Sequence, residues 1–332
     1  MIISRTPFRI SFFGGGTDYA PWFKEHKGSV VATTIDKYCY ITCRYLPPFF
    51  EYKSRILYSK IELVKKINEI DHPAVRECLR FMQIKQGVQV HHDGDLPART
   101  GLGSSSAFTV GLLNSLYALK GIMPTKDQLA REAIYVEQQL CKENVGCQDQ
   151  TLAAYGGLNY IEFGGDSHLR VHKITMPDQR LKLLQKHLML FFTGFSRMAS
   201  KIAKHQIKSI PDKQKELQTM MDMTQQAIHI LNSNDLEPFG KLLDASWQIK
   251  RTLSPKVSTP YIDQLYETAL RAGALGGKLL GAGGGGFVLL FVPPERQKRV
   301  REKLKKFLEI PFKFEFSGSQ IIFYQPNTGV IE

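Results

Sequence analysis

The sequence predicts an α+β fold, because strand-like and helix-like segments occur in separate groups along the chain. Residues 1–13 and 30–45 are rich in β-branched and aromatic residues, which is typical of strands. Apolar residues at a spacing of three or four dominate 197–250, which is typical of long helices. Strands and helices that segregate in this way form α+β domains rather than a sheet of alternating βαβ units.

A polar, turn-rich stretch around residues 166–179 is the expected domain boundary. A chain of 332 residues has the length of about two domains, which agrees with such a division. We therefore expect one domain at 1–170 and a second at 171–332. The other elements follow from the same periodicities. Helices are expected at 104–119, at 125–142 with Thr125 as N-cap, at 261–272 and in the basic segment after 292, and strands at 88–92, 188–193, 287–292 and 320–324.

Composition and charge indicate a cytoplasmic globular protein that meets anions. The net charge of +13 attracts nucleic acid, acidic membranes or phosphorylated metabolites, although basic helix surfaces explain part of it. The five cysteines include no C-x-x-C pair, which argues against a disulfide framework and a thiolate zinc site. Arg5 and Arg9 interrupt any apolar signal segment, and the longest apolar run, 287–292, is too short to span a bilayer. We therefore expect no membrane partner.

The segment 97–107 carries the strongest sign of phosphate binding. It reads Pro-Ala-Arg-Thr-Gly-Leu-Gly-Ser-Ser-Ser-Ala, so glycines let the backbone approach a ligand closely before serines open a helix. The free N–H groups and the dipole of that helix start favour an anion, and its hydroxyls can face Mg²⁺. No Gly-Lys-Ser/Thr follows, so this is not a Walker A loop. A serine-capped helix after a flexible turn is the structural alternative.

A second glycine-rich segment, 276–286, reads Gly-Gly-Lys-Leu-Leu-Gly-Ala-Gly-Gly-Gly-Gly. It matches G-x-G-x-x-G, but dinucleotide binding requires a strand before that pattern and a helix after it. Here a helix is expected before it and a strand after it, so we reject a dinucleotide site. Consecutive glycines have a large entropy cost. A loop that presses its backbone against substrate or phosphate explains that cost better than a flexible linker does.

A third glycine turn follows the first strand. Residues 5–10 read Arg-Thr-Pro-Phe-Arg-Ile, and residues 14–19 read Gly-Gly-Gly-Thr-Asp-Tyr. A cation and a carboxylate therefore flank a glycine turn at the end of a strand. A lone Asp at such a place is more often a simple turn residue.

Two further acids stand out. Glu137 shares a predicted helix face with small and apolar residues, where a carboxylate needs a cation or a hydrogen-bond donor as partner. Mg²⁺ and a structural Arg are equal candidates for that partner. Asp149 lies between a glycine turn and a new apolar run. It could cap the next helix or project into a cleft as a base.

Together and in this order, the glycine segments resemble the motifs of the GHMP kinase superfamily, which includes galactokinase, homoserine kinase, mevalonate kinase and phosphomevalonate kinase. The first motif resembles 5–19, the second 97–107 and the third 278–286, and they span nearly the whole chain. The resemblance implies the GHMP kinase fold. In that fold an N-terminal ribosomal-S5-domain-2-like domain binds the nucleotide, a ferredoxin-like α+β domain follows, and the active site lies in the cleft between them.

The resemblance also implies roles for individual residues in phosphoryl transfer from ATP. Asp149 matches the catalytic aspartate that accepts or orients the proton of the acceptor hydroxyl. Arg9 takes the place of the basic residue near the transferring phosphoryl. Ser105 and Glu137 would hold Mg²⁺. ATP would contact Pro97, Gly101, Leu102, Gly103, Ser104, Ser105 and Ser106, and the sugar would contact Gly15, Gly16, Thr17, Asp18, Gly283, Gly284 and Gly285.

The first motif is similar to one branch of the superfamily. Galactokinases carry Glu-His where this chain has Gly15-Gly16, whereas Gly-Gly-Gly-Thr-Asp is similar to D-glycero-D-manno-heptose 7-phosphate kinases and fucokinase-type enzymes. The resemblance implies phosphorylation of the anomeric (C1) hydroxyl of heptose 7-phosphate, for nucleotide-activated heptose in bacterial surface polysaccharide. Arg197 and Lys256 are the predicted contacts of the 7-phosphate, with Lys250 and Arg251 as further candidates. Exposed helix charge explains these residues equally well.

Three alternatives stay open: an L-fucokinase or other anomeric sugar kinase, a family member that decarboxylates or only senses ligands, and a nucleic-acid-binding protein. Intact Asp149, Glu137 and Ser105 argue against a sensor. Only the charge suggests nucleic acid, and no basic motif with interleaved aromatic residues supports it. We therefore expect a small phosphorylated sugar as partner, ATP and Mg²⁺ as cofactors, and no nucleic acid. The oligomeric state is open, with a homodimer as one option.

Overall fold

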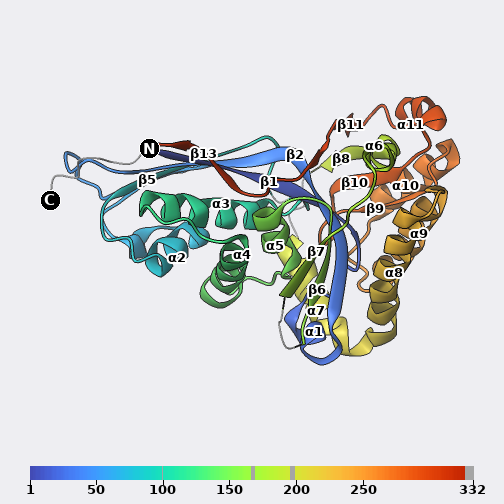
Figure 1. Cartoon of the computed structure of the whole chain (residues 1–332), viewed down its shortest axis with the longest axis horizontal. Coiled ribbons are helices and arrows are strands. Elements are labelled where there is room, and N and C mark those ends of the chain that lie inside the picture. The colour runs from blue at the N-terminus through green and yellow to red at the C-terminus, as the bar shows by residue number, and fades with distance from the viewer. Residues whose placement is uncertain (99, 166–168, 195–198, 326–332) are drawn as a thin grey trace.

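The computed structural model of the chain describes residues 1–98, 100–165, 169–194 and 199–325. These residues form two parts, each with its own sheet and its own helices (Figure 1). The predicted α+β architecture is confirmed. Among the described residues, no helix is both long enough and apolar enough to cross a bilayer.

The first sheet is centred on one long strand, β2 (Gly28–Tyr45), whose many Val, Ile, Thr and Tyr residues suit a pleated and largely buried surface. Strand β1 (Ile2–Phe13) pairs antiparallel with β2 along most of its length. Strand β5 pairs with the C-terminal half of β2, whereas β6 and β12 pair with its N-terminal half. The other strands of this sheet are β3 (Ser54–Leu57), β4 (Ile61–Val64), β5 (Val88–Gly94), β6 (Asn159–Phe163), β7 (Leu169–Lys173), β12 (Phe314–Glu315) and β13 (Gln320–Tyr324).

Helices cover one face of the first sheet (Figure 1). Helix α3 (Ser104–Leu119) is apolar around most of its circumference, so it is buried between β1, β2 and the neighbouring helices. Helix α4 (Lys126–Tyr135) begins at the predicted N-cap, because the Thr125 hydroxyl accepts a hydrogen bond from the N–H of Gln128 at 3.1 Å. It continues as a π-helical turn at Val136–Leu140. The other helices here are α1 (Ala20–His26), α2 (Pro73–Phe81) and α5 (Gln148–Tyr155).

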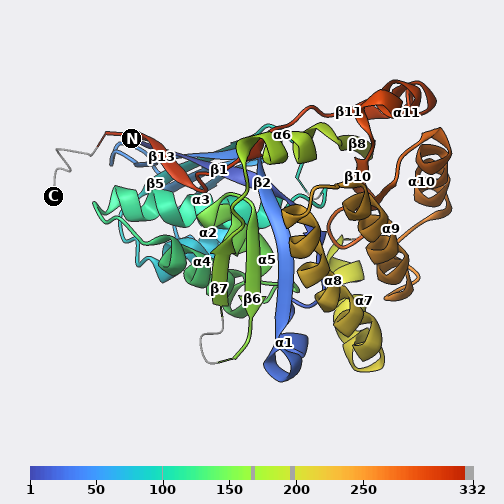
Figure 2. The same cartoon turned by 45° about the vertical axis from the view of Figure 1, so that its right-hand side comes forward.

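The second sheet has the strand order β11-β8-β10-β9. All six residues of β10 (Gly286–Phe291) are buried, as its continuous apolar run predicts. Helices α9 and α10 lie on the outer side of this part, and α8 lies between α9 and strand β2 of the first sheet (Figure 2). The bounds are β8 (Leu188–Gly194), β9 (Gly276–Leu279), β11 (Leu308–Glu309), α6 (Asp178–Lys186), α7 (Ala199–Ser209), α8 (Gln214–Asn232), α9 (Glu237–Thr252), α10 (Pro260–Ala272) and α11 (Gln297–Lys303).

The chain departs from the expected division into 1–170 and 171–332 in two places. Strand β7 crosses the expected boundary and pairs with β6 in the first sheet. After α11 the chain returns to the first sheet, where β12 pairs with β2 and β13 pairs with β1. Arg5 and Gln320, which are 315 residues apart, are hydrogen-bonded through their side chains. Local sequence patterns carry no sign of a pairing over such a distance.

Candidate active site

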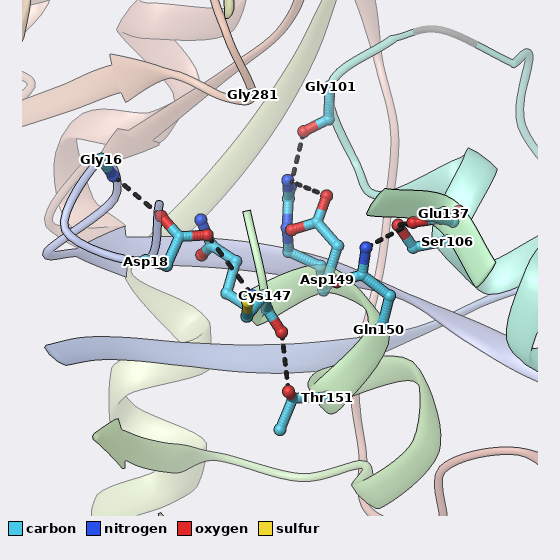
Figure 3. A network of polar contacts seen from close by, with 12 residues as sticks. Gly16, Asp18, Gly101, Ser106, Glu137, Cys147, Asp149, Gln150, Thr151 and Gly281 are labelled. Carbon is cyan, nitrogen blue, oxygen red and sulfur yellow. Dashed lines mark hydrogen bonds and ion pairs between the residues drawn. The ribbon is translucent and has the colours of Figure 1, made fainter. Parts of the chain in front are cut away.

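Two glycine loops, one from each part, meet backbone to backbone (Figure 3). A Cβ on Gly101 would lie 2.4 Å from the carbonyl oxygen of Leu280, and a Cβ on Gly281 would lie 2.5 Å from the Cα of Gly101. A Cβ on Gly286 would lie 2.2 Å from the carbonyl oxygen of Thr100. Only glycine allows so close an approach. The first loop precedes α3, and the second joins β9 to β10.

The second loop differs from the prediction in what precedes it. The sequence suggested a helix before this loop, and the structure has the strand β9 there. A strand, β10, follows the loop as predicted. The dinucleotide fingerprint requires a helix after the glycines, so the rejection of a dinucleotide site now rests only on the strand that follows them.

Arg9 connects the first loop to Asp149. Its Nε and Nη2 donate to the two carboxylate oxygens of Asp149 at 2.7 and 2.8 Å, and its Nη1 donates to the carbonyl oxygen of Gly101 at 2.6 Å (Figure 3). A forked guanidinium–carboxylate pair fixes the orientation of both groups. Arg9 is 5% exposed, whereas the Asp149 side chain is 24% exposed. The two residues predicted to be catalytic therefore lie together, with one side of the carboxylate open to solvent.

The N-terminus of α3 lies beside this pair. Gly103 is the N-cap in a left-handed conformation, with φ 74°. A Cβ on Gly103 would lie 3.1 Å from Cγ of Arg9 and 3.3 Å from Oδ2 of Asp149. Ser104 is half-buried and Ser105 is exposed, so a ligand can reach both. The N–H groups of this helix start form a site suited to a phosphate.

Two other residues predicted to contact ATP shape the loop. Leu102 is fully buried in the core, and its carbonyl oxygen accepts a hydrogen bond from the N–H of Arg9 at 3.0 Å. Pro97 is exposed at the start of the loop, and its carbonyl oxygen accepts a hydrogen bond from the Thr100 hydroxyl at 2.8 Å. The Leu102 side chain therefore anchors the loop and is not available to a ligand.

Glu137 lies in a buried pocket of neutral donors behind the start of α3 (Figure 3). Its carboxylate accepts hydrogen bonds from the hydroxyls of Ser106 and Thr109, both at 2.8 Å, and from Nε2 of Gln150. Burial raises the pKa of Glu137 to about 7, the three donors oppose that rise, and the charge of Asp149 adds to it. The structural Arg considered as its partner is not found among the described residues.

Glu137 is hydrogen-bonded to Ser106, and the joint holding of Mg²⁺ by Ser105 and Glu137 stays a prediction. Successive residues of an α-helix point about 100° apart, so only one of these two serines faces Glu137. Ser105 is exposed on another side of the helix start. The π-helical turn that contains Glu137 adds a residue to the helix and turns this side chain further, and such turns are frequent at functional sites.

Asp18 is buried close to Asp149 and is held by backbone donors (Figure 3). The N–H groups of Gly16 and Gln148 donate to its carboxylate at 3.0 and 3.3 Å. Burial raises the pKa of Asp18, and the charge of Asp149 adds to the rise. A Cβ on Gly146 would lie 1.9 Å from Oδ2 of Asp18, so that glycine makes room for the carboxylate. The predicted sugar-binding aspartate is thus placed next to the predicted catalytic one.

Thr17 does not fit its predicted role in substrate binding. Its hydroxyl lies 2.8 Å from the carbonyl oxygen of Gly14 and 2.9 Å from that of Ser29, and it accepts a hydrogen bond from the N–H of Ser29 at 3.0 Å. The residue is fully buried. Thr17 therefore fastens the glycine turn to β2 and offers no free group to a ligand.

Two buried lysines of the C-terminal part lie at the site. Lys250 was one of the candidate phosphate contacts, whereas Lys278 was given no separate role from the sequence. Nζ of Lys250 on α9 donates to the carbonyl oxygen of Gly281 at 2.5 Å. Burial, together with the charge of Arg9, lowers the pKa of Lys250 to about 8. Nζ of Lys278 on β9 donates to the carbonyl oxygen of Phe12 at 2.7 Å, and burial holds the pKa of Lys278 well below its usual range. The available signal for Lys278 was a lone lysine among glycines and leucines, because lysine is seldom buried without a partner.

The remaining predicted contacts lie at the loop after α9 or outside the described residues. The glycine run 283–285 has positive φ angles of 122°, 78° and 147°. A Cβ on Gly283 would lie 2.6 Å from the carbonyl oxygen of Val257, so this run packs against the loop after α9. Lys256 is exposed in that loop and contacts a neighbouring histidine. Arg197 lies outside the described residues.

The family comparisons agree with this geometry. The description "GHMP kinases N terminal domain" matches residues 63–157, and "GHMP kinases C terminal" matches residues 227–310. The first match contains the loop before α3 and Asp149, and the second contains Lys250 and the loop before β10. Together they cover more than half of the chain. The chain belongs to the GHMP kinases, a family of phosphotransferases, and it has their fold with N- and C-terminal domains.

The relatives differ in their acceptors. D-glycero-alpha-D-manno-heptose 7-phosphate kinase of Campylobacter jejuni is 28% identical over 326 residues, which cover 92% of this chain and 93% of that protein. Galactokinase of Pyrococcus furiosus is 26% identical over 373 residues, with 99% of each chain covered. Bifunctional fucokinase/GDP-fucose pyrophosphorylase of Arabidopsis thaliana is 24% identical over 92% of this chain, which spans 31% of that longer protein.

Solved structures share the fold. A D-glycero-D-manno-heptose 1-phosphate kinase from Bacteroides thetaiotaomicron superposes with a TM-score of 0.79 at 22% identity, covering 96% of this chain and 98% of that one. Phosphomevalonate kinase of Streptococcus pneumoniae, in complex with phosphomevalonate and AMPPNP, gives a TM-score of 0.76 at 14% identity, covering 95% and 100%. At such low identities the structural similarity shows the fold alone and does not identify the acceptor.

Proposed function

We propose that this protein is an ATP- and Mg²⁺-dependent kinase that phosphorylates the C1 hydroxyl of D-glycero-D-manno-heptose 7-phosphate to the 1,7-bisphosphate. The observation that carries the proposal is the forked pair of Arg9 and Asp149 beside the start of α3 and the joined glycine loops. Phosphoryl transfer needs positioning and charge neutralisation more than covalent chemistry. A partly exposed carboxylate, a buried guanidinium and helix N–H groups supply these needs.

In this proposal Asp149 accepts or orients the proton of the acceptor hydroxyl. The hydroxyl oxygen attacks the γ-phosphorus of ATP, the bond from that phosphorus to the bridging oxygen breaks, and ADP leaves. Arg9 lies beside the transferring phosphoryl. Its charge and the N–H groups of α3 offset the negative charge on the phosphoryl oxygens. Asp18 accepts hydrogen bonds from sugar hydroxyls.

The residues fit a Mg²⁺ ion that is held mainly by the nucleotide phosphates, which is the usual mode for this ion. Within the described residues, no group of three or more His, Cys, Asp and Glu side chains could hold a metal. Glu137 is a buried carboxylate surrounded by neutral donors, and Ser105 has an exposed hydroxyl at the helix start. These two oxygen donors would hold the ion. Its chemistry is the neutralisation of charge on the phosphate oxygens.

The choice of acceptor is supported by the names of two relatives. Both the Campylobacter relative and the Bacteroides structure are named as kinases of heptose phosphates. The net charge of +13 also suits a reaction in which both substrates carry phosphate. The second candidate is an anomeric kinase of an unphosphorylated sugar such as L-fucose, which the Arabidopsis relative supports.

The experiment is a transfer assay with ATP and Mg²⁺ on three acceptors: D-glycero-D-manno-heptose 7-phosphate, L-fucose and D-galactose. The expected product is a C1 phosphate of the heptose, identified by ³¹P NMR through its coupling to the anomeric proton. Asp149→Asn is expected to lower kcat at least about 100-fold. Transfer only to an unphosphorylated sugar would overturn the acceptor, and an Asp149→Asn variant with most of its kcat would remove Asp149 from its role.

A further inference from the structure

Two buried polar atoms beside the aspartates have no hydrogen-bond partner. They are Oγ of Ser11 and Oε1 of Gln148. Ser11 is 6% exposed and Gln148 is 9% exposed. A buried polar group without a partner costs free energy, and proteins retain few of them. A pair of such atoms at one site therefore calls for a ligand that completes their hydrogen bonds.

The backbone brings these two side chains to the reacting groups. Ser11 follows Arg9 by two residues on β1, so both side chains point to the same face of that strand. Gln148 directly precedes Asp149 in the first turn of α5. The N–H of Gln148 donates to the carboxylate of Asp18 at 3.3 Å. Gln148 therefore lies beside both aspartates, and Ser11 lies on the same face of β1 as Arg9.

Because Gly15 has no side chain, there is space beside Oγ of Ser11 and Nε2 of Gln148. A Cβ on Gly15 would lie 3.5 Å from Oγ of Ser11 and 3.7 Å from Nε2 of Gln148, which are ordinary van der Waals contacts. Gly15 has no left-handed φ, so its backbone alone does not require glycine. A larger residue at this position would fill space that now borders Ser11 and Gln148.

The chemistry of these groups selects a neutral hydroxyl ligand. An amide oxygen only accepts hydrogen bonds, and so does an ionised carboxylate, whereas the Ser11 hydroxyl both donates and accepts. A ligand group that meets Gln148 Oε1 and Asp18 must therefore donate. A phosphate dianion has no proton to donate and would be repelled by Asp18 and Asp149.

We propose that Ser11 and Gln148 bind the hydroxyl groups of the acceptor sugar above Gly15, next to Asp18. This inference rests on the proposed function, because it assigns binding groups to the acceptor of that reaction. It also places the hydroxyl-bearing ring at Gly15 and keeps the acceptor's phosphate away from the two aspartates.

The test compares Ser11→Ala and Gln148→Met with the wild type in KM for the acceptor, KM for ATP and kcat. Each variant should raise the KM of heptose 7-phosphate about tenfold, roughly the factor for one hydrogen bond, and leave the KM of ATP unchanged. Gly15→Ala should raise the acceptor KM in the same way by filling the space. The matched control is Ser115→Ala, because the buried Ser115 hydroxyl on α3 also has no partner but does not border Gly15.

Melting temperatures separate binding from folding. Neither Ser11→Ala nor Ser115→Ala should lower Tm, because each removes an unsatisfied hydroxyl, and only Ser11→Ala should raise the acceptor KM. Saturation-transfer NMR with heptose 7-phosphate and D-galactose measures sugar binding without ATP. A wild-type protein that binds sugar but transfers no phosphate would refute the proposed kinase activity. Loss of that sugar binding in Ser11→Ala would still support the assignment of Ser11 to the sugar site. Acceptor KM and sugar binding within twofold of the wild type in both variants would overturn it.

Discussion

Replacing Glu137 with Gln should stabilise the protein at pH 8 while removing its kinase activity. Gln has nearly the same shape as Glu, and the hydroxyls of Ser106 and Thr109 can each donate or accept, so the pocket can keep its hydrogen bonds. The substitution removes only the ability of the side chain to ionise. Activity is lost in our proposal because the amide cannot replace a carboxylate beside Mg²⁺.

The magnitude follows from the pKa of Glu137, which burial raises from 4.5 to about 7. Between these values the folded protein keeps a proton that the unfolded chain releases, so the stability of the wild type falls as pH rises. At about 1.4 kcal/mol for each pKa unit, a difference of about 2.5 costs about 3 kcal/mol above pH 7. With about 2.1 cal/mol/K of unfolding entropy per residue over 332 residues, this corresponds to about 5 °C in Tm.

The assay is Tm from pH 5 to pH 8, without nucleotide, for the wild type and Glu137→Gln. The difference in Tm between them should be small near pH 5 and should grow by about 5 °C in favour of the variant by pH 8. The matched control is Glu132→Gln on α4, because Glu132 is half-buried and also accepts only from neutral donors, Tyr117 and Gln128. An equal change with pH in the Tm difference of this control would show that the effect does not come from the burial of Glu137.

A second Tm measurement tests whether Glu137 acts together with Mg²⁺. Mg²⁺ with a non-hydrolysable ATP analogue should raise Tm of the wild type more than that of Glu137→Gln at pH 8, because the cation offsets the buried charge. Two results would refute this reasoning. One is a Tm difference that stays constant from pH 5 to pH 8, and the other is equal stabilisation of both proteins by the Mg²⁺ nucleotide.

Three other substitutions test the loops and their cations. Gly101→Ala should lower both Tm and kcat, because its Cβ would collide with a carbonyl oxygen at 2.4 Å. The control Gly121→Ala, with a similar φ but nothing within 4 Å, should lower Tm only through backbone strain. Equal losses in the two variants would refute the contact between the loops. Wild-type kcat/KM should fall as pH rises through about 8, where Lys250 loses its charge. This fall should be absent in the slower Lys250→Met variant, and a fall that persists there would exclude Lys250 as its source. Arg9→Lys should lower kcat about 100-fold, because one ammonium cannot make the forked pair, and a near-normal kcat would contradict that role.

Much of the fold was predictable because its signals are local. The bounds of α3 and the N-cap Thr125 agree with the prediction from apolar spacing and capping chemistry. The strands β1, β2, β8 and β10 follow from runs of β-branched and aromatic residues. Strand β7 was missed because its five residues lie in a polar stretch, where its pairing with β6 outweighs its composition.

The site was predictable to the level of loops and acids, but not of contacts. Arg9, Asp149 and the two glycine loops were expected to converge, and they do. The hydrogen bond from Ser106 to Glu137 was not predictable, because it depends on helix rotation and on the π-helical turn. Thr17 looked like a ligand-binding residue because its motif lies at the site, whereas its hydroxyl is used inside the fold.

Most helices and strands, the family and the chemical types at the site can be predicted from the sequence, because glycine runs and serines at a helix start are local features. Which of these groups meet depends on the tertiary structure. Lys250 and Lys278 enter the site from the C-terminal part, and the side chains of Ser11 and Gln148, each with one unpartnered atom, border Gly15. These placements depend on the packing of segments far apart in the chain, where burial changes a lysine or a serine from a surface residue into part of a site.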